Sequence, residues 1–334
     1  MSSAKQIIAL IKTHTDGDED AFFSIALQVA AAEARQGRRR SAEELRDVID
    51  KARRQNQSTS PSVAIPFARP RGDLEGLIDM HQPQLLLKDV ILKEENASQL
   101  NDVIRQQRKR DWLREHGKVP NRRVLFVGPP GSGKTMTAQA LAGELKLPLF
   151  VIRLEYLITR FMGATAAKLR LIFDETAKKR GVYLFDEFDA VGSDRLATND
   201  VAEMRRVLNS FLQFMEESNS TDSLIICATN HPSLLDQALL RRYDLVLKFE
   251  EPNEKQIQAL IKSNLHPFKH SRLAWKRITE QAKGLSQSEI VNAISDAVKT
   301  SILDEKNTVT SDSIIRRLEE RQQMRTSFLD KNII

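Results

Sequence analysis

Short apolar runs alternate with longer segments of helical periodicity through the middle of the chain. Buried strands are predicted at 124–127, 148–153, 181–186, 223–229 and 245–249. Helices are predicted at 94–115, 134–145, 165–180, 200–217 and 232–239, where apolar residues recur at helical spacing. Strands that alternate with helices in this way are typical of an α/β domain built on a parallel sheet.

The pattern changes on both sides of this region. After Pro252 only helical patterns occur, near 253–264, 271–283, 286–303 and 310–322, and they predict a separate helical lid. Residues 2–54 show helical patterns, but a unit of this size can form only a marginal hydrophobic core. We therefore expect it to pack against the main body or against a partner. The predicted units are an N-terminal helical domain (1–54), a linker rich in proline and polar residues (55–75), an α/β core (76–251), a helical lid (252–322) and a C-terminal tail (323–334).

The bulk composition is that of an ordinary globular protein, since 41% of the 334 residues are hydrophobic and 29% are charged. No apolar run approaches the roughly 20 residues that a membrane span requires. The N-terminus lacks the pattern of a signal peptide. Cys227 is the single cysteine, which excludes an intrachain disulfide. We therefore expect a cytoplasmic protein with no membrane partner.

Basic residues are densest at Arg38–Arg40 and Arg105–Arg110, in a chain of net charge +6. Runs of this kind usually cover solvated helix faces, and we favour that interpretation over a nucleic-acid-binding patch. The composition neither demands nor excludes a nucleic-acid partner.

One predicted strand leads directly into a phosphate-binding sequence. The run 124–127 is followed by G-x-x-x-x-G-K-T and by a helical run that begins at Met136. The loop consists of Gly128, Pro129, Pro130, Gly131, Ser132, Gly133, Lys134 and Thr135. Its glycines let backbone N–H groups converge on nucleotide phosphates, where the helix N-terminus adds partial positive charge. Lys134 can reach the β- and γ-phosphates and the Thr135 hydroxyl can ligate Mg²⁺, so we expect a nucleoside triphosphate site rather than an empty glycine-rich turn.

Two further strands end in polar residues. The run 182–185 leads into Asp186 and Glu187, at the sheet edge where open α/β sheets bind ligands. Asp186 is then placed to hold Mg²⁺ through water, and Glu187 to polarise the attacking water. Asn230 follows another buried strand and can hydrogen-bond that water or the γ-phosphate. Taken alone, Asp186 and Glu187 could be incidental acids at a strand end, and Asn230 could simply form a turn. The spacing of these residues after the phosphate loop favours a functional role.

Arg241 and Arg242 precede the last predicted strand. Adjacent arginines at such a place are usually surface charge. In this context they indicate arginine fingers, guanidinium groups offered to the γ-phosphate of a neighbouring subunit.

In order and spacing, these segments resemble the AAA+ ATPase family, and within it the AAA group of proteasomal, katanin-like and FtsH-like unfoldases. The resemblance covers roughly 80–305 and includes Walker A (128–135), Walker B (182–187) and sensor 1 (228–230). Residues 239–244 resemble the second region of homology, whose usual form L-L-R-P-G-R-F-D here lacks Pro-Gly, so either or both arginines remain candidates for the finger. Residues 284–289 resemble the lid motif G-h-S-x-x-[DE] of the group without a sensor 2 arginine.

The resemblance also implies a substrate path and an assembly. Val90 and Ile91 resemble the segment that packs on adenine. Phe161, Met162 and Gly163 resemble the aromatic-hydrophobic-glycine pore loop, although the first two side chains could instead cover the core. The family fold implied is a P-loop parallel sheet with a C-terminal helical lid, and the family assembly is a hexameric ring that binds ATP with Mg²⁺ between subunits.

The function predicted from this resemblance is an ATP-hydrolysing homo-hexamer that remodels or unfolds protein substrates through a central pore. It would act alone or feed a separate protease, because no H-E-x-x-H or G-x-S-x-G motif occurs. A nucleic-acid-associated loader or regulator and an ATP-gated adaptor ring are the alternatives.

Overall fold

The computed structural model describes residues 76–154, 157, 164–188, 198–217, 221–231, 240–270, 272–305 and 308–329. The predicted N-terminal domain and linker, the helix expected at 232–239 and the pore-loop residues Phe161–Gly163 lie outside these ranges. All the described residues belong to one unit, Pro70–Ile334.

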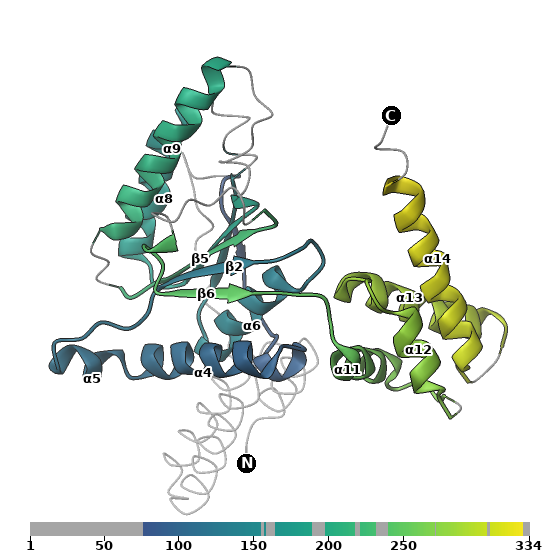
Figure 1. Cartoon of the computed structure of the whole chain (residues 1–334). Coiled ribbons are helices and arrows are strands. Elements are labelled where there is room, and N and C mark those ends of the chain that lie inside the picture. The colour runs from purple at the N-terminus through teal and green to yellow at the C-terminus, as the bar shows by residue number, and fades with distance from the viewer. Residues whose placement is uncertain are drawn as a thin grey trace, which may run out of the picture. The chain divides into compact units, whose positions relative to one another are not determined.

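Six strands of the described residues form one sheet in the order β1-β3-β4-β5-β2-β6 (Figure 1). They are β1 (Asp79–His81), β2 (Arg123–Val127), β3 (Leu149–Arg153), β4 (Val182–Asp186), β5 (Leu224–Thr229) and β6 (Leu245–Lys248). The last five pair in parallel, which confirms the parallel α/β sheet predicted from the sequence. The short strand β1 pairs antiparallel with β3 and was not predicted, because three residues carry no usable alternation of apolar and polar positions.

The helices of the core are α4 (Glu94–Arg108), α5 (Arg110–Glu115), α6 (Lys134–Leu145), α8 (Thr165–Lys178) and α9 (Thr198–Glu216), with a 3₁₀ turn at Leu87–Asp89. The predicted helix 94–115 is interrupted at Lys109, whose φ of −106° and ψ of 25° are not helical. No apolar residue stands between Ile104 and Trp112, so the apolar pattern gave no sign of this break.

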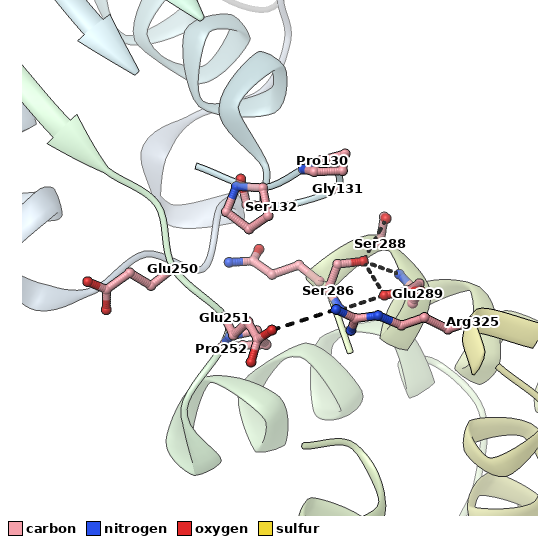
Figure 2. A pocket seen from close by; sticks show the side chains of 12 residues that line it. Pro130, Gly131, Ser132, Glu250, Glu251, Pro252, Ser286, Ser288, Glu289 and Arg325 are labelled. Carbon is pink, nitrogen blue, oxygen red and sulfur yellow. Dashed lines mark hydrogen bonds and ion pairs between the residues drawn. The ribbon is translucent and has the colours of Figure 1, made fainter. Parts of the chain in front are cut away.

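The lid consists of α11 (Glu254–Leu265), α12 (Trp275–Gln281), α13 (Gln287–Leu303) and α14 (Ser311–Leu329). The helix α14 continues past the end predicted at 322 and includes Met324 and Phe328, which the sequence analysis had placed in a C-terminal tail. Ser286 and Ser288, at the start of α13, lie across a small cavity from Pro130 and Gly131 of the phosphate loop (Figure 2).

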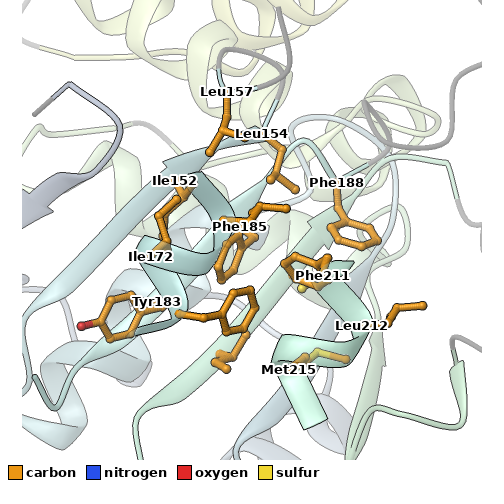
Figure 3. Packing of buried hydrophobic residues seen from close by; sticks show 14 of the residues in the cluster. Ile152, Leu154, Leu157, Ile172, Tyr183, Phe185, Phe188, Phe211, Leu212 and Met215 are labelled. Atoms are coloured by element: carbon orange, nitrogen blue, oxygen red, sulfur yellow. The ribbon is translucent and has the colours of Figure 1, made fainter. Parts of the chain in front are cut away.

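Side chains alternate along each parallel strand between two hydrophobic clusters. On one face, Phe185 and Tyr183 pack with Phe173 of α8 and Phe211 of α9 (Figure 3). The aromatic rings of Phe185 and Phe211 meet edge to face, with centroids 5.0 Å apart. The other face carries Phe126 and its neighbours, which pack against α4 and α6. A third, separate cluster lies within the four lid helices, so the lid has a core of its own.

Candidate nucleotide site

The phosphate loop connects β2 to α6 through backbone conformations that only glycine adopts easily. Gly133 has a φ of 92° and occupies the N-cap of α6. Gly128 lies so close to the next strand that an added Cβ would sit 2.3 Å from the carbonyl oxygen of Phe249. The loop therefore keeps its shape through backbone geometry, with the first N–H groups of α6 directed at the space where phosphates bind.

Lys134 is 7% exposed and its ammonium group is fully engaged with the ends of two strands. Its Nζ donates to the carbonyl oxygens of Gly128 at 2.7 Å and Pro129 at 2.9 Å. It also donates to Oδ1 of Asn230 at 2.8 Å, which joins the phosphate loop to the end of β5. A γ-phosphate bound between Lys134 and Asn230 would contact both residues that the sequence assigned to it.

Thr135 and Asp186 supply neighbouring oxygen atoms. The Thr135 hydroxyl donates to Oδ2 of Asp186 at 2.9 Å, so the first helical turn after the loop is in contact with the end of β4. A hydroxyl and a carboxylate oxygen are ligands that suit Mg²⁺, which keeps several waters when bound to protein. These two residues therefore fit the metal site predicted for them.

Glu187 follows Asp186 in the left-handed region, with a φ of 55°. Non-glycine residues adopt this conformation at a cost of order 1–3 kcal/mol, and such strain concentrates at functional sites. The Glu187 N–H donates to Oδ1 of Asp186 at 3.0 Å, which helps to hold the turn. The turn directs Glu187 into the same cavity as the phosphate loop.

This cavity has a volume of about 580 Å³, within the range of small-molecule sites. It is lined by Asp89, Ile91, Pro130, Gly131, Ser132, Gly133, Lys134, Thr135, Met136, Asp186, Glu187 and Asn230 from the core, and by Leu260, Ser263, Asn264, Gln287, Ser288, Val291 and Asn292 from the lid. Ser132 Oγ is buried and has no hydrogen-bond partner among the described residues. A buried hydroxyl of this kind in a phosphate loop fits a polar ligand such as a nucleotide phosphate.

The lid closes the cavity through the start of α13. Ser286 caps this helix: its hydroxyl accepts from the Glu289 N–H at 3.3 Å, and its own backbone N–H donates to the Glu289 carboxylate at 2.7 Å. The backbone N–H of Ser288 donates to the carbonyl oxygen of Gly131 at 3.0 Å. Gln287 Nε2 donates to the carbonyl oxygen of Ile91 at 3.3 Å. The motif at 284–289 marked this segment, but its direct contacts with the phosphate loop could not be read from the sequence.

A second, smaller cavity lies beside the same loop (Figure 2). It has a volume of about 330 Å³ and shares Pro130, Gly131 and Ser132 with the first. Its far wall includes Glu251, at the connection between core and lid, which lies 4.0 Å from Arg325 of α14. The phosphate loop thus lines two cavities, and lid residues line both of them.

Three of the residues assigned to the nucleotide, Val90, Pro129 and Gly128, do not line the larger cavity. Ile91 and Met136 line the larger cavity, whereas Val90 is buried and does not line it. Pro129 lines only the smaller cavity. Gly128 lines neither, and its part is to allow the close approach of Phe249.

Arg241 and Arg242 lie outside the cavity and on the surface of the core. Nε of Arg242 is 3.2 Å from Oε1 of Glu216, in the same chain. Arg241 is exposed, and no ion pair is seen for it within the described ranges. Asp244, three residues further, receives hydrogen bonds from the Arg123 guanidinium and from two backbone N–H groups. Burial raises the pKa of Asp244, but these bonds outweigh it and hold the pKa below its usual range, so the segment is anchored to the start of β2.

The described residues hold neither a helix that could span a membrane nor a cluster of side chains that could bind a metal ion. No described helix combines the length and the apolar character that a membrane span requires. No group of three or more histidine, cysteine or acidic side chains that could hold a metal ion is found there. Burial raises the pKa of the Cys227 thiol to about 12, so this cysteine stays protonated.

Comparison with known proteins decides the family. Residues 124–251 match the family described as "ATPase family associated with various cellular activities (AAA)". An uncharacterized AAA family ATPase of Sinorhizobium fredii, y4kL, is 32% identical over 92% of this chain and 92% of its own length. The chain belongs to the AAA family of ATPases.

Other relatives of this AAA ATPase match a smaller share of its length. The ATP-dependent zinc metalloprotease FtsH of Pseudomonas putida is 31% identical over 65% of this chain, and that of Marinobacter nauticus is 34% identical over 65%. In both, the match covers 36% of the relative, so the chain spans about a third of the length of these proteases. The ATPase activity and the α/β core with C-terminal helices predicted from the sequence are thereby confirmed.

Proposed function

We propose that this AAA ATPase works as a ring, most simply a homo-hexamer, that remodels or unfolds protein substrates. The observation that carries the proposal is the composition of the larger cavity. Residues that follow β2, β4 and β5 line it together with residues of α11 and α13. A change in the nucleotide there acts on the core and the lid at once, which is what a machine that converts hydrolysis into movement requires.

Each residue of the cavity has a role in this proposal. The phosphate loop with Lys134 binds the triphosphate, and Thr135 and Asp186 hold Mg²⁺, which would neutralise charge that develops on the phosphate oxygens. Glu187 takes a proton from the attacking water, and Asn230 orients that water or the γ-phosphate. The contact of Asn230 with Lys134 supports this assignment because it brings both groups to one point.

Variants of the two candidate arginine fingers test whether one nucleotide site is shared between two subunits. We favour Arg241 as the finger, because Arg242 is already paired with Glu216. Arginine fingers contribute about 10³–10⁵ in rate, so Arg241→Ala homomers should lose most of their ATPase activity and Arg242→Ala homomers much less. Steady-state ATPase rates of the two variants give the comparison.

Mixed assemblies then show on which subunit the finger acts. An Arg241→Ala subunit keeps a complete pocket, and a Glu187→Gln subunit keeps a finger, so mixing two inactive proteins should restore ATPase activity. If mixtures at every ratio stay inactive while both proteins co-assemble, the arginine acts within its own subunit and the shared site is wrong.

The unfolding role is tested at Phe161. With a stably folded, fluorescent substrate that carries an unstructured tail, wild type should unfold the substrate in the presence of ATP. Phe161→Ala should lose unfolding and keep basal ATPase activity, because the pore loop grips substrate and is not part of the nucleotide site. Unchanged activity of Phe161→Ala in the cell would favour the adaptor ring, and ATPase stimulation by DNA but not by unfolded protein would favour the nucleic-acid loader.

A further inference from the structure

Most of the excess positive charge lies in one short segment. Residues 105–123 contain eight arginines and lysines against two acidic residues, so their formal charge of +6 equals that of the whole chain. The segment runs from the last turn of α4 through α5 to the first residue of β2 (Figure 1). Arg180 joins it from the residues just before β4. We call 105–123 together with Arg180 the basic corner.

The basic corner is remote from the nucleotide cavity. It lies where the parallel strands β2 and β4 begin, whereas the phosphate loop and Asp186 lie where these strands end. The corner is therefore not explained by the binding of ATP.

One buried carboxylate compensates only part of this charge. The Asp222 side chain is 3% exposed, and its Oδ2 lies 2.9 Å from Nη2 of Arg114. Arg122 and Arg180 also feel the charge of Asp222. Burial and the nearby Arg110 lower the pKa of Arg180, which shows how closely the cations are crowded. Glu144 compensates Arg108 at 3.0 Å and Asp244 compensates Arg123 at 2.6 Å, so these acids together with Asp222 still leave the basic corner net positive.

Two guanidinium nitrogens of the basic corner are unsatisfied. Nη1 of Arg110 and Nε of Arg180 are buried and have no hydrogen-bond partner among the described residues. Buried donors are nearly always paired, and an exception usually marks a strained, functional, water-binding or ion-binding group. Planar guanidinium groups in particular match the oxygen pairs of phosphate.

An exposed aromatic side chain stands in the middle of the basic corner. Trp112 of α5 is 58% exposed. The ring of His116 lies beside it, with centroids 4.5 Å apart. Single-stranded nucleic acids are bound by this combination, since cations follow the backbone and aromatic rings stack on unpaired bases.

We propose that the basic corner binds the phosphate backbone of a single-stranded nucleic acid, with a base stacked on Trp112. An acidic polypeptide is the competing occupant. The exposed indole favours nucleic acid because its flat ring can stack on a base. The positive charge also extends over two helices, whereas a site for a single carboxylate would be smaller. This inference is independent of the remodelling function, because the binding surface lies at the opposite edge of the sheet from the cavity.

The test measures binding of the full chain to a fluorescent single-stranded oligonucleotide by anisotropy, over a series of salt concentrations. Wild type should bind with a dissociation constant of about 10⁻⁴–10⁻⁶ M at physiological salt. Lys109→Gln with Lys118→Gln removes two exposed charges of the corner. It should weaken binding roughly tenfold and reduce the slope of log K against log salt by about 1.4, since each lost contact with a single strand changes the slope by about 0.7.

The matched control is Lys269→Gln with Lys276→Gln, which removes two exposed charges from the lid and should bind as wild type does. Trp112→Ala should weaken binding about fivefold or more, and Trp112→Phe should restore part of it. Arg110→Gln should weaken binding with little change in the midpoint of thermal unfolding, because the ion pair that it loses, from Nε to Oδ1 of the exposed Asp111 at 3.4 Å, contributes little to stability.

Several outcomes overturn the proposal. Wild type that shows no binding at protein concentrations of about 10⁻⁴ M has no such site. Equal losses of oligonucleotide affinity in the corner and lid double variants would mean that the protein attracts nucleic acid by its overall charge and not through a defined site. Two results together would assign the corner to an acidic polypeptide instead. Polyglutamate would displace the oligonucleotide at the same charge concentration, and Trp112→Ala would bind the oligonucleotide as wild type does.

Discussion

Replacing Lys134 with alanine should abolish nucleotide binding. The ammonium group is positioned by two carbonyl oxygens and by Asn230, and it is the cation of the phosphate loop. Charge-assisted hydrogen bonds contribute about 1.5–3 kcal/mol each. Loss of contacts with two phosphates therefore predicts a loss of affinity of about 10²–10⁴-fold. Titration with a fluorescent ATP analogue measures it.

The control is Lys178→Ala, which shortens an exposed lysine at the end of α8 and should bind ATP normally. The midpoint of thermal unfolding shows whether Lys134→Ala remains folded once the three acceptors around the ammonium group lose their donor. A folded Lys134→Ala protein that binds ATP as wild type does would remove the phosphate-loop assignment.

Replacing Glu187 with glutamine should separate binding from hydrolysis. The amide has nearly the shape of the carboxylate but cannot accept a proton, and loss of a general base costs about 10²–10⁴-fold in rate. ATP binding should stay close to wild type, because the phosphate loop and Asp186 are intact. The assembly should then hold ATP and remain closed.

Single-turnover hydrolysis and the mass of the assembly with ATP give the two measurements. Glu319→Gln, an exposed acid of α14, is the matched control. Hydrolysis by Glu187→Gln at the wild-type rate would reassign the base. A Glu187→Gln protein that stays monomeric with ATP bound would argue against a ring.

The elements with a regular pattern of apolar residues could be predicted from the sequence. Phe126, Phe185 and Ile226 stand in apolar runs long enough to identify buried strands, and the five parallel strands are found there. The short strand β1 and the break at Lys109 could not be predicted, because each depends on pairing or packing rather than on local pattern.

The candidate site likewise has a part that could be predicted from the sequence and a part that could not. Lys134, Thr135, Asp186 and Asn230 follow predicted strands, and the cavity brings them together as expected. The contacts of Gln287 and Ser288 with the core depend on how the lid packs, which no local pattern encodes. The choice between the two arginines could not be predicted from the sequence, because it depends on the pairing of Arg242 with Glu216 and on a neighbouring subunit, and the ATPase rates of the two variants test it.

The hydrophobic cluster inside the lid has a mechanical consequence. Because Ile261, Ile294 and Ile314 pack with one another and not with the sheet, no large apolar surface has to be exposed when the lid changes its angle. The short connection around Pro252 can then serve as a hinge, and the few hydrogen bonds from α13 to the phosphate loop set its resting position. Under the proposed remodelling function, a change in the angle of the lid would exchange only a handful of polar contacts, so little of the free energy of ATP hydrolysis would go into unfolding the protein itself.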